Sequence, residues 1–135
     1  GVEGLTASYA TNDINGGSAG INGDTDAFAL AYVMGSITAK YSNNDYDVGL
    51  ATQDQETEAY SISYTVSDSL SVTYGIESID EGTLVSDAEY SKISGSYTTG
   101  GMTISASMAE GENIAGGTAA NQDLEYWSLG ASFAF

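Results

Sequence analysis

The stretch WSLGASFAF, residues 127–135, alternates large apolar residues with small ones. Side chains of an extended strand point to opposite faces in turn. One face of this segment therefore receives Trp127, Leu129, Ala131, Phe133 and Phe135, and the other receives serine, glycine and alanine. The pattern predicts an amphipathic β-strand that ends on an aromatic residue. Such a strand needs an apolar environment on one side only.

Seven further segments repeat this alternation. In one of them Tyr60, Ile62 and Tyr64 are separated by serines. No segment keeps the 3.6-residue period of an amphipathic helix, so the chain is predicted to be all-β. We expect eight strands in a single domain that spans residues 1–135. The seven segments are residues 5–10, 28–34, 37–42, 60–66, 70–77, 92–98 and 102–108.

The predicted connections are alternately short and long. Tight turns are expected at residues 34–36, 67–69 and 98–101. Long loops rich in Gly, Asn and Asp are expected at residues 11–26, 43–58, 78–89 and 110–125, and they hold most of the carboxylates, so the strands are expected to be almost uncharged. Short turns at one end and long loops at the other are typical of an antiparallel transmembrane β-barrel.

The composition excludes several classes of function. The chain has nineteen acidic residues and only two basic ones, giving a formal net charge of −17, so nucleic acid is not an expected partner. His, Cys and Arg are absent. Without them there is no thiolate metal site and no evident nucleophile–base pair, so we expect no enzyme activity.

The ending at Phe135 resembles the C-terminal signature of Gram-negative outer-membrane β-barrels. The hairpins at residues 28–41, 60–76 and 90–108 resemble those of alphaproteobacterial-type general porins. The resemblance implies a passive diffusion channel in the bacterial outer membrane, in contact with lipid and lipopolysaccharide and assembled as a homotrimer. It also implies that Trp127, Leu129, Phe133 and Phe135 form the assembly signal.

The small residues between the apolar ones bear on the size of the barrel. In a closed eight-stranded barrel, a lining of Ser, Thr, Ala and Gly would leave voids, whereas a wall of ~16 strands borders a water-filled channel. We therefore expect the C-terminal half of a ~16-stranded porin. The alternative is a self-contained eight-stranded barrel that acts as a structural anchor or adhesin through its acidic loops. A third reading is a secreted, calcium-loaded β protein.

Six residues are predicted to line the channel. Lys40 and Lys92 lie in mid-strand on the small-polar side, where a lysine avoids the cost of facing lipid. They can tune ion selectivity, or they can pair locally with Glu77 or with a loop carboxylate. The nineteen carboxylates predict a preference for cations over anions among small hydrophilic solutes. The predicted lining residues are Lys40, Lys92, Glu77, Ser63, Thr73 and Ser105.

Two acidic segments offer oxygen ligands for a hard metal ion. Asp24 and Asp26 flank one threonine, and Asp45 and Asp47 flank one tyrosine. Carboxylates suit Ca²⁺ or Mg²⁺, but Asp and Gly are also ordinary turn residues. We expect no tightly bound cofactor. Loosely bound Ca²⁺ or Mg²⁺ at the acidic loops, bridging to lipopolysaccharide phosphates, remains an expectation of the charge.

Overall fold

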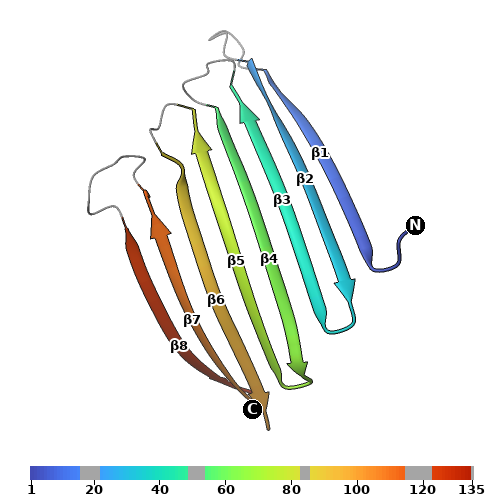
Figure 1. Cartoon of the computed structure of the whole chain (residues 1–135), viewed down its shortest axis with the longest axis vertical. Coiled ribbons are helices and arrows are strands. Elements are labelled where there is room, and N and C mark those ends of the chain that lie inside the picture. Colours follow the sequence, from blue (N-terminus) through green and yellow to red (C-terminus); the bar gives the residue numbers. More distant parts are fainter. Residues whose placement is uncertain (16–21, 49–53, 83–85, 115–122, 135) are drawn as a thin grey trace.

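A computed structural model describes residues 1–15, 22–48, 54–82, 86–114 and 123–134 (Figure 1). Within these ranges the chain forms eight β-strands, and no helix of sufficient length and hydrophobicity to cross a bilayer occurs there. The all-β prediction is confirmed. The strands are β1 (Leu5–Asn15), β2 (Asn22–Met34), β3 (Ile37–Asp47), β4 (Gln55–Ser67), β5 (Leu70–Glu81), β6 (Ala88–Thr99), β7 (Met102–Glu112) and β8 (Leu124–Phe133).

The strands form one antiparallel sheet in the order of the sequence, from β1 to β8. Each strand pairs with its neighbours in the chain, so the connections are hairpins (Figure 1). The three predicted tight turns are confirmed at the lower end of the sheet. Gly35, Gly100 and Gly101 adopt positive φ angles there, which glycine does without steric cost.

The predicted bounds of the long loops are wrong, although the connections between strands are longer at the upper end of the sheet than at the tight turns. Residues 16–21, 49–53, 83–85 and 115–122 of these loops lie outside the described residues. The strands continue into the ranges predicted as loops, and ladder pairs such as Thr11 with Asp26 and Asp45 with Glu56 extend the sheet well above the apolar segments. The expectation of almost uncharged strands is therefore wrong as well. The physical reason is that acids alternate with Thr, Tyr or Ile at these ends, as in Asp24-Thr25-Asp26, and this keeps the period of two that a strand requires.

The sheet is open. β1 pairs only with β2 and β8 only with β7, so the described strands do not close into a barrel. Apolar side chains on the two edge strands have a neighbouring strand on one side only. Trp127 and Leu129 of β8 are therefore 74% and 71% exposed, whereas Val72 in the middle of the sheet is 37% exposed. Neither edge ladder contains a register shift. The one irregularity in the sheet is a β-bulge between Thr65 and Ser67 of β4.

The sheet is a single layer without an interior. Among the described residues, Val48 and Ala88 are the only buried hydrophobic ones. Large apolar side chains on every strand are exposed, for example those of Tyr60, Ile62 and Ile93. The hydrophobic alternation therefore sorts side chains between two open faces rather than between a core and a surface.

Candidate functional site: the two faces of the sheet

The strand register defines the two faces. Residues directly opposite each other on neighbouring strands share a face, so each row of pairs can be followed across the sheet. One row, on what we call the apolar face, contains Leu5, Tyr32, Ala39, Ile62, Tyr74, Ile93, Met108 and Trp127. The opposite side is called the polar face.

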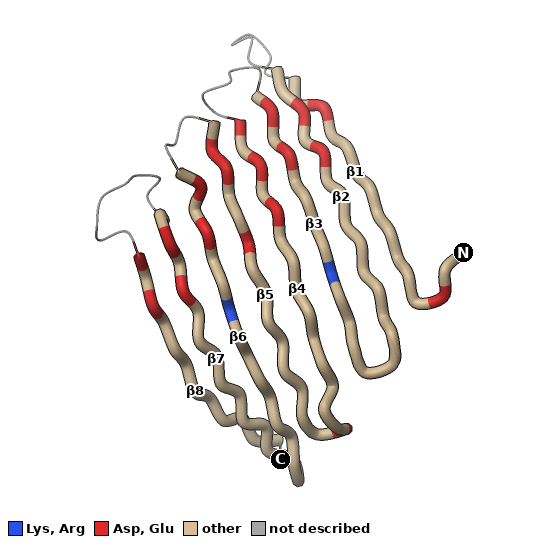
Figure 2. The backbone as a smooth tube through the Cα atoms, in the orientation of Figure 1, with Lys and Arg blue, Asp and Glu red and all other residues tan. Residues whose placement is uncertain are grey.

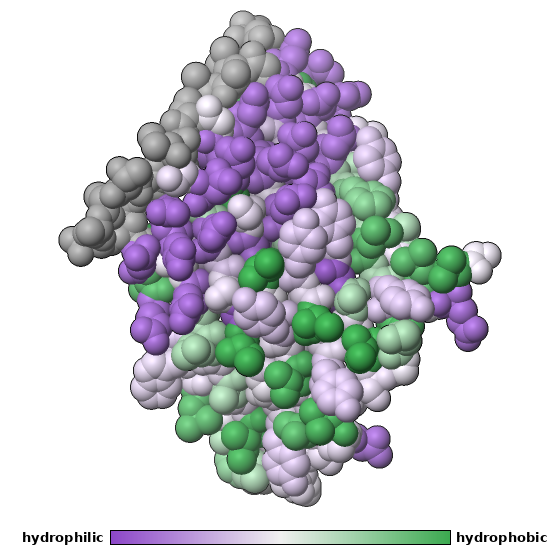
Figure 3. Space-filling view, viewed as in Figure 1, coloured by the Kyte–Doolittle hydropathy of each residue, from purple (hydrophilic) through white to green (hydrophobic). Residues whose placement is uncertain are grey.

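The lower part of the apolar face is a continuous apolar belt. Figure 3 shows this face, with hydrophobic and aromatic side chains below and hydrophilic ones above. Rings pack along the upper edge of the belt: the centroids of Tyr41 and Tyr60 are 4.9 Å apart, and those of Phe28 and Tyr41 are 6.3 Å apart. The belt consists of alternate residues in the segments 5–9, 28–34, 37–41, 60–64, 70–76, 93–97, 102–108 and 127–133.

The upper part of the same face is an acidic band. Figure 2 shows that most of the Asp and Glu residues lie along the upper ends of the strands. The register places twelve of the nineteen carboxylates on the apolar face rather than on the polar one. The band consists of Asp13, Asp24, Asp26, Asp45, Asp47, Glu56, Glu58, Asp80, Glu89, Glu110, Glu112 and Glu125.

Carboxylates in the band directly oppose one another. Asp45 faces Asp26 on one neighbouring strand and Glu56 on the other. Partial loss of water contact, followed by repulsion from Glu56, Asp26 and the other acids nearby, raises the pKa of Asp45. Like charges opposite each other destabilise a sheet. The opposed pairs are Asp13–Asp24, Asp24–Asp47, Asp26–Asp45, Asp45–Glu56, Glu56–Asp80, Glu89–Glu112 and Glu110–Glu125.

Hydrogen bonds join the belt to the band. The Tyr9 hydroxyl donates to Oδ1 of Asp26 at 2.5 Å, and the Tyr41 hydroxyl donates to Oε1 of Glu58 at 2.8 Å. The bond from Tyr9, with a second from Thr11, lowers the pKa of Asp26. Tyrosines at the upper edge of the belt therefore keep their rings among apolar residues and direct their hydroxyls toward the carboxylates.

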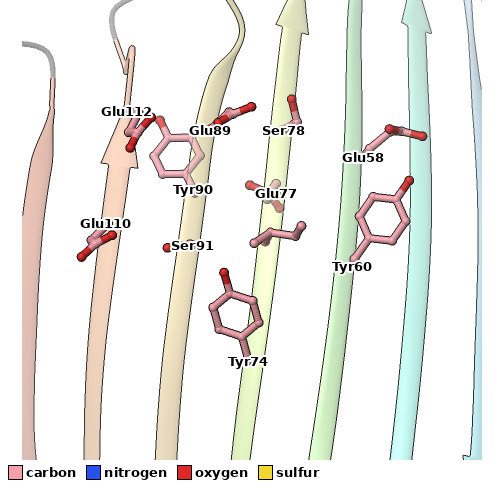
Figure 4. Close-up of a pocket in the computed structure, with 11 residues that line it drawn as sticks. Glu58, Tyr60, Tyr74, Glu77, Ser78, Glu89, Tyr90, Ser91, Glu110 and Glu112 are labelled. Atoms are coloured by element: carbon pink, nitrogen blue, oxygen red, sulfur yellow. The ribbon is translucent and has the colours of Figure 1, made fainter.

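An open hollow of about 260 Å³ lies where belt and band meet. In Figure 4 the hydroxyl ends of Tyr60 and Tyr74 point toward the acidic end of the strands. Several glutamates surround it, among them Glu58, Glu89 and Glu110. The hollow is thus the meeting point of the two regions of the apolar face.

The four aspartates considered as metal ligands do come together. Asp24 opposes Asp47, and Asp26 opposes Asp45, on β2 and β3 of the acidic band. Among the residues that the structure describes, however, no group of three or more carboxylates is placed to hold a metal ion. The aspartates are strand residues with alternate spacing, not the ligands of a folded loop.

The polar face carries rows of hydroxyl groups below a row with both lysines. Lys40 pairs with Ser61, Ser61 with Gly75, and Gly75 with Lys92, so the two lysines lie three strands apart, about 14 Å. The row directly below contains Thr38, Ser63, Thr73, Ser94, Ser107 and Ser128, one from each strand from β3 to β8. The next row contains Thr65, Ser71, Ser96 and Ser105.

Several hydroxyls of the polar face bond to each other across strands. The Oγ of Ser63 lies 2.9 Å from Oγ1 of Thr73, and the Oγ of Ser107 lies 2.8 Å from that of Ser128. Ser71 and Ser96 form a third pair at 3.0 Å. Because a hydroxyl both donates and accepts, these pairs keep capacity for a further polar partner.

The predicted site residues fall into two groups. Lys40, Lys92 and Glu77, with Ser63, Thr73 and Ser105, share the polar face. Glu77 lies opposite Tyr90. It is two residues further along β5 than Gly75, the partner of Lys92, so Glu77 and Lys92 are diagonal neighbours on the same face. The assembly-signal residues Trp127, Leu129 and Phe133 lie on the belt side of β8, and Phe135 lies outside the described residues.

The acidic band is the feature that the sequence interpretation missed. Its signal is the spacing of the acids: Glu56-Thr57-Glu58 and Glu110-Gly111-Glu112 place carboxylates at alternate positions. This spacing matches a strand and assigns both acids of each triplet to one face.

Comparisons of the chain with protein families, curated proteins and solved structures found no match.

Proposed function

We propose that this chain forms part of the wall of a bacterial outer-membrane channel, through which small hydrophilic solutes diffuse passively. In this proposal the apolar belt meets lipid, the polar face borders water, and the acidic band stands above the bilayer beside the lipopolysaccharide headgroups. A transmembrane strand requires this combination of an apolar outward row and a polar inward row.

The observation that carries the proposal is the separation of the two faces over all eight strands. Belt residues such as Ile62 and Val72 are open to the surroundings on a sheet without a core, whereas Ser63 and Thr73, one position away, lie on the polar face. Exposed apolar surface of this extent marks an interaction site. The tyrosines along its upper edge suit a membrane interface, where the ring meets lipid and the hydroxyl meets water.

We propose further that the complete barrel has ~16 strands, with this chain as its C-terminal half. The unpaired edges at β1 and β8 support a wall that continues on both sides. So do the small residues of the polar face, since Ser, Thr, Gly and Ala leave room for water. The resemblance to general porins adds a homotrimer to the proposal.

The ion preference of the channel depends on both faces. The formal net charge of −17 favours cations at the mouth. The two lysines lie on the polar face and oppose that field within the channel. We propose a net preference for cations that fades as added salt screens the mouth.

Paired cysteine substitutions test the wall directly, because the natural chain contains no cysteine. In lipid bilayers, Ser63→Cys, Thr73→Cys and Ser105→Cys should react with a small membrane-impermeant thiol reagent. The matched neighbours Ile62→Cys, Val72→Cys and Ile104→Cys should stay unreactive, since one step along a strand changes the face. Single-channel conductance is measured on the same samples.

Each outcome of this experiment has a meaning. Reaction of the first set alone, with conductance, supports the channel. Protection of all six positions without conductance would favour a self-contained barrel that acts as an anchor. Equal reaction of both sets would contradict membrane insertion.

A further inference from the structure

A second hollow lies on the polar face, below one of the two lysines. It has a volume of about 350 Å³. Its lining includes Lys92 and the hydroxyl groups of Ser94, Ser96, Ser105, Ser107 and Ser128. We call it the serine hollow.

The two lysines have different surroundings, although they share one row (Figure 2). Lys40 lines another hollow, which contains Ala29, Ala31 and Ala59 as well as the hydroxyl residues Thr6, Ser8, Ser42 and Ser61. Lys92 lines the serine hollow, where most of the lining residues carry a hydroxyl group. Both lysines therefore lie beside aliphatic hydroxyl groups, and these groups are more numerous in the hollow that Lys92 lines.

Two hydroxyls in the serine hollow are available for a solute. Within the described residues, the side chains of Ser94 and Ser105 make no hydrogen bond, whereas Ser107 and Ser128 bond to each other. A hydroxyl group offers one donor and two acceptors, which matches the hydroxyls of a sugar chain. An ammonium group adds a charge-assisted hydrogen bond to a carboxylate or phosphate.

We propose that the serine hollow is a transient binding site for polyhydroxylated anions, such as sugar acids, on their way through the channel. This inference rests on the proposed function, because it requires the polar face to border the solute path. Lys92 binds the anionic group, and the serines bind the hydroxyls along the rows below. The hollow is open, so the solute binds weakly and leaves quickly, as passage requires.

Titration of the folded protein in detergent micelles tests the site without relying on transport. D-gluconate is the probe, with D-glucose and acetate as matched solutes that lack the charge or the hydroxyl chain. Backbone amide chemical shifts of Ser94, Ser105 and Ser107 are followed by NMR. We expect saturable shifts with gluconate and weaker binding of either control.

The lysine variants provide the matched comparison. Lys92→Gln should weaken gluconate binding about tenfold, the typical worth of one charge-assisted hydrogen bond. Lys40→Gln removes the same charge from the same row and should leave the affinity within about twofold. Ser105→Ala should weaken gluconate and glucose but not acetate.

Three outcomes would overturn the site: no saturable shift with gluconate, equal affinity for gluconate and glucose, or equal losses in both lysine variants. Conductance separates this test from that of the proposed function. A conducting channel that gives any of these outcomes remains a channel and lacks the solute site.

Discussion

The apolar face and the polar face are built from the same eight strands, yet they differ in charge. The apolar face holds twelve carboxylates above its belt, whereas the polar face holds both lysines of the chain and, on its strands, the two carboxylates Glu77 and Glu81. The period of two along a strand therefore sorts charge as well as hydrophobicity between the faces. The lesson is that the net charge of the chain does not describe the charge of either surface.

The largest expected effect comes from placing a lysine on each face in turn. Ile104→Lys introduces a charge near the middle of the belt on β7 and should cost about 2–4 kcal/mol in a bilayer. Ser105→Lys, one position away on the polar face, should cost far less, because in the proposed channel this face borders water. Urea unfolding of both variants in lipid vesicles measures the difference. Equal destabilisation would refute the assignment of the faces.

An intermediate effect is expected in ion selectivity. The double variant Lys40→Gln/Lys92→Gln removes the positive charges of the polar face and should raise the ratio of K⁺ to Cl⁻ permeability roughly twofold. Asp26→Asn/Asp45→Asn removes two charges from the acidic band and should change this ratio less, since the band lies on the other face. Reversal potentials in a salt gradient measure both ratios. A larger change in the aspartate variant would mean that the band governs the channel field.

The smallest effects are expected within the acidic band. The raised pKa of Asp45 means that the folded state holds this proton more tightly than the unfolded chain does. Asp45 therefore destabilises the fold at neutral pH, and this penalty is lost as the pH falls through the folded pKa. Asp45→Asn should slow hydrogen exchange at the upper ends of β3 and β4 roughly twofold to fivefold at neutral pH.

Asp26 should behave in the opposite way. Its lowered pKa means that the ionised form stabilises the folded state above the unfolded pKa, and this contribution is lost as the pH falls through the folded value. Asp26→Asn should therefore speed exchange at the upper ends of β1 and β2 at neutral pH. The same direction of change in both variants would contradict the roles that their hydrogen bonds and neighbours define.

The sequence predicts the strands and the short turns because both depend on local patterns. Alternating residues such as Tyr60, Ile62 and Tyr64 identify a strand, and Gly35 identifies a turn. The upper ends of the strands were not predicted, because acids alternate there with threonine or tyrosine. Such a segment has the period of two but lacks the alternating apolar residues that identify a strand. Asp45 is the example: it resembles a loop residue by type and is a strand residue by spacing.

The candidate site was predicted in part for the same reason. The face on which a side chain lies depends only on its position within its own strand, so Lys40 and Lys92 could be assigned to the small-polar side from the sequence. That the two lysines share one row, and that Lys92 lies among the serines of β6, β7 and β8, depends on the register between the strands. Register is fixed by the whole ladder and cannot be read from one strand.

The unpaired edges have a consequence for how the protein folds. The lower parts of β1 and β8 carry no charge, and the chain contains no proline, so neither edge has the usual protection against a passing strand. Left alone in water, such edges would template aggregation with any extended segment. In the proposed channel, both edges therefore have to pair with their partner strands soon after the hairpins form. The order in which strands become available for pairing then helps to specify the fold.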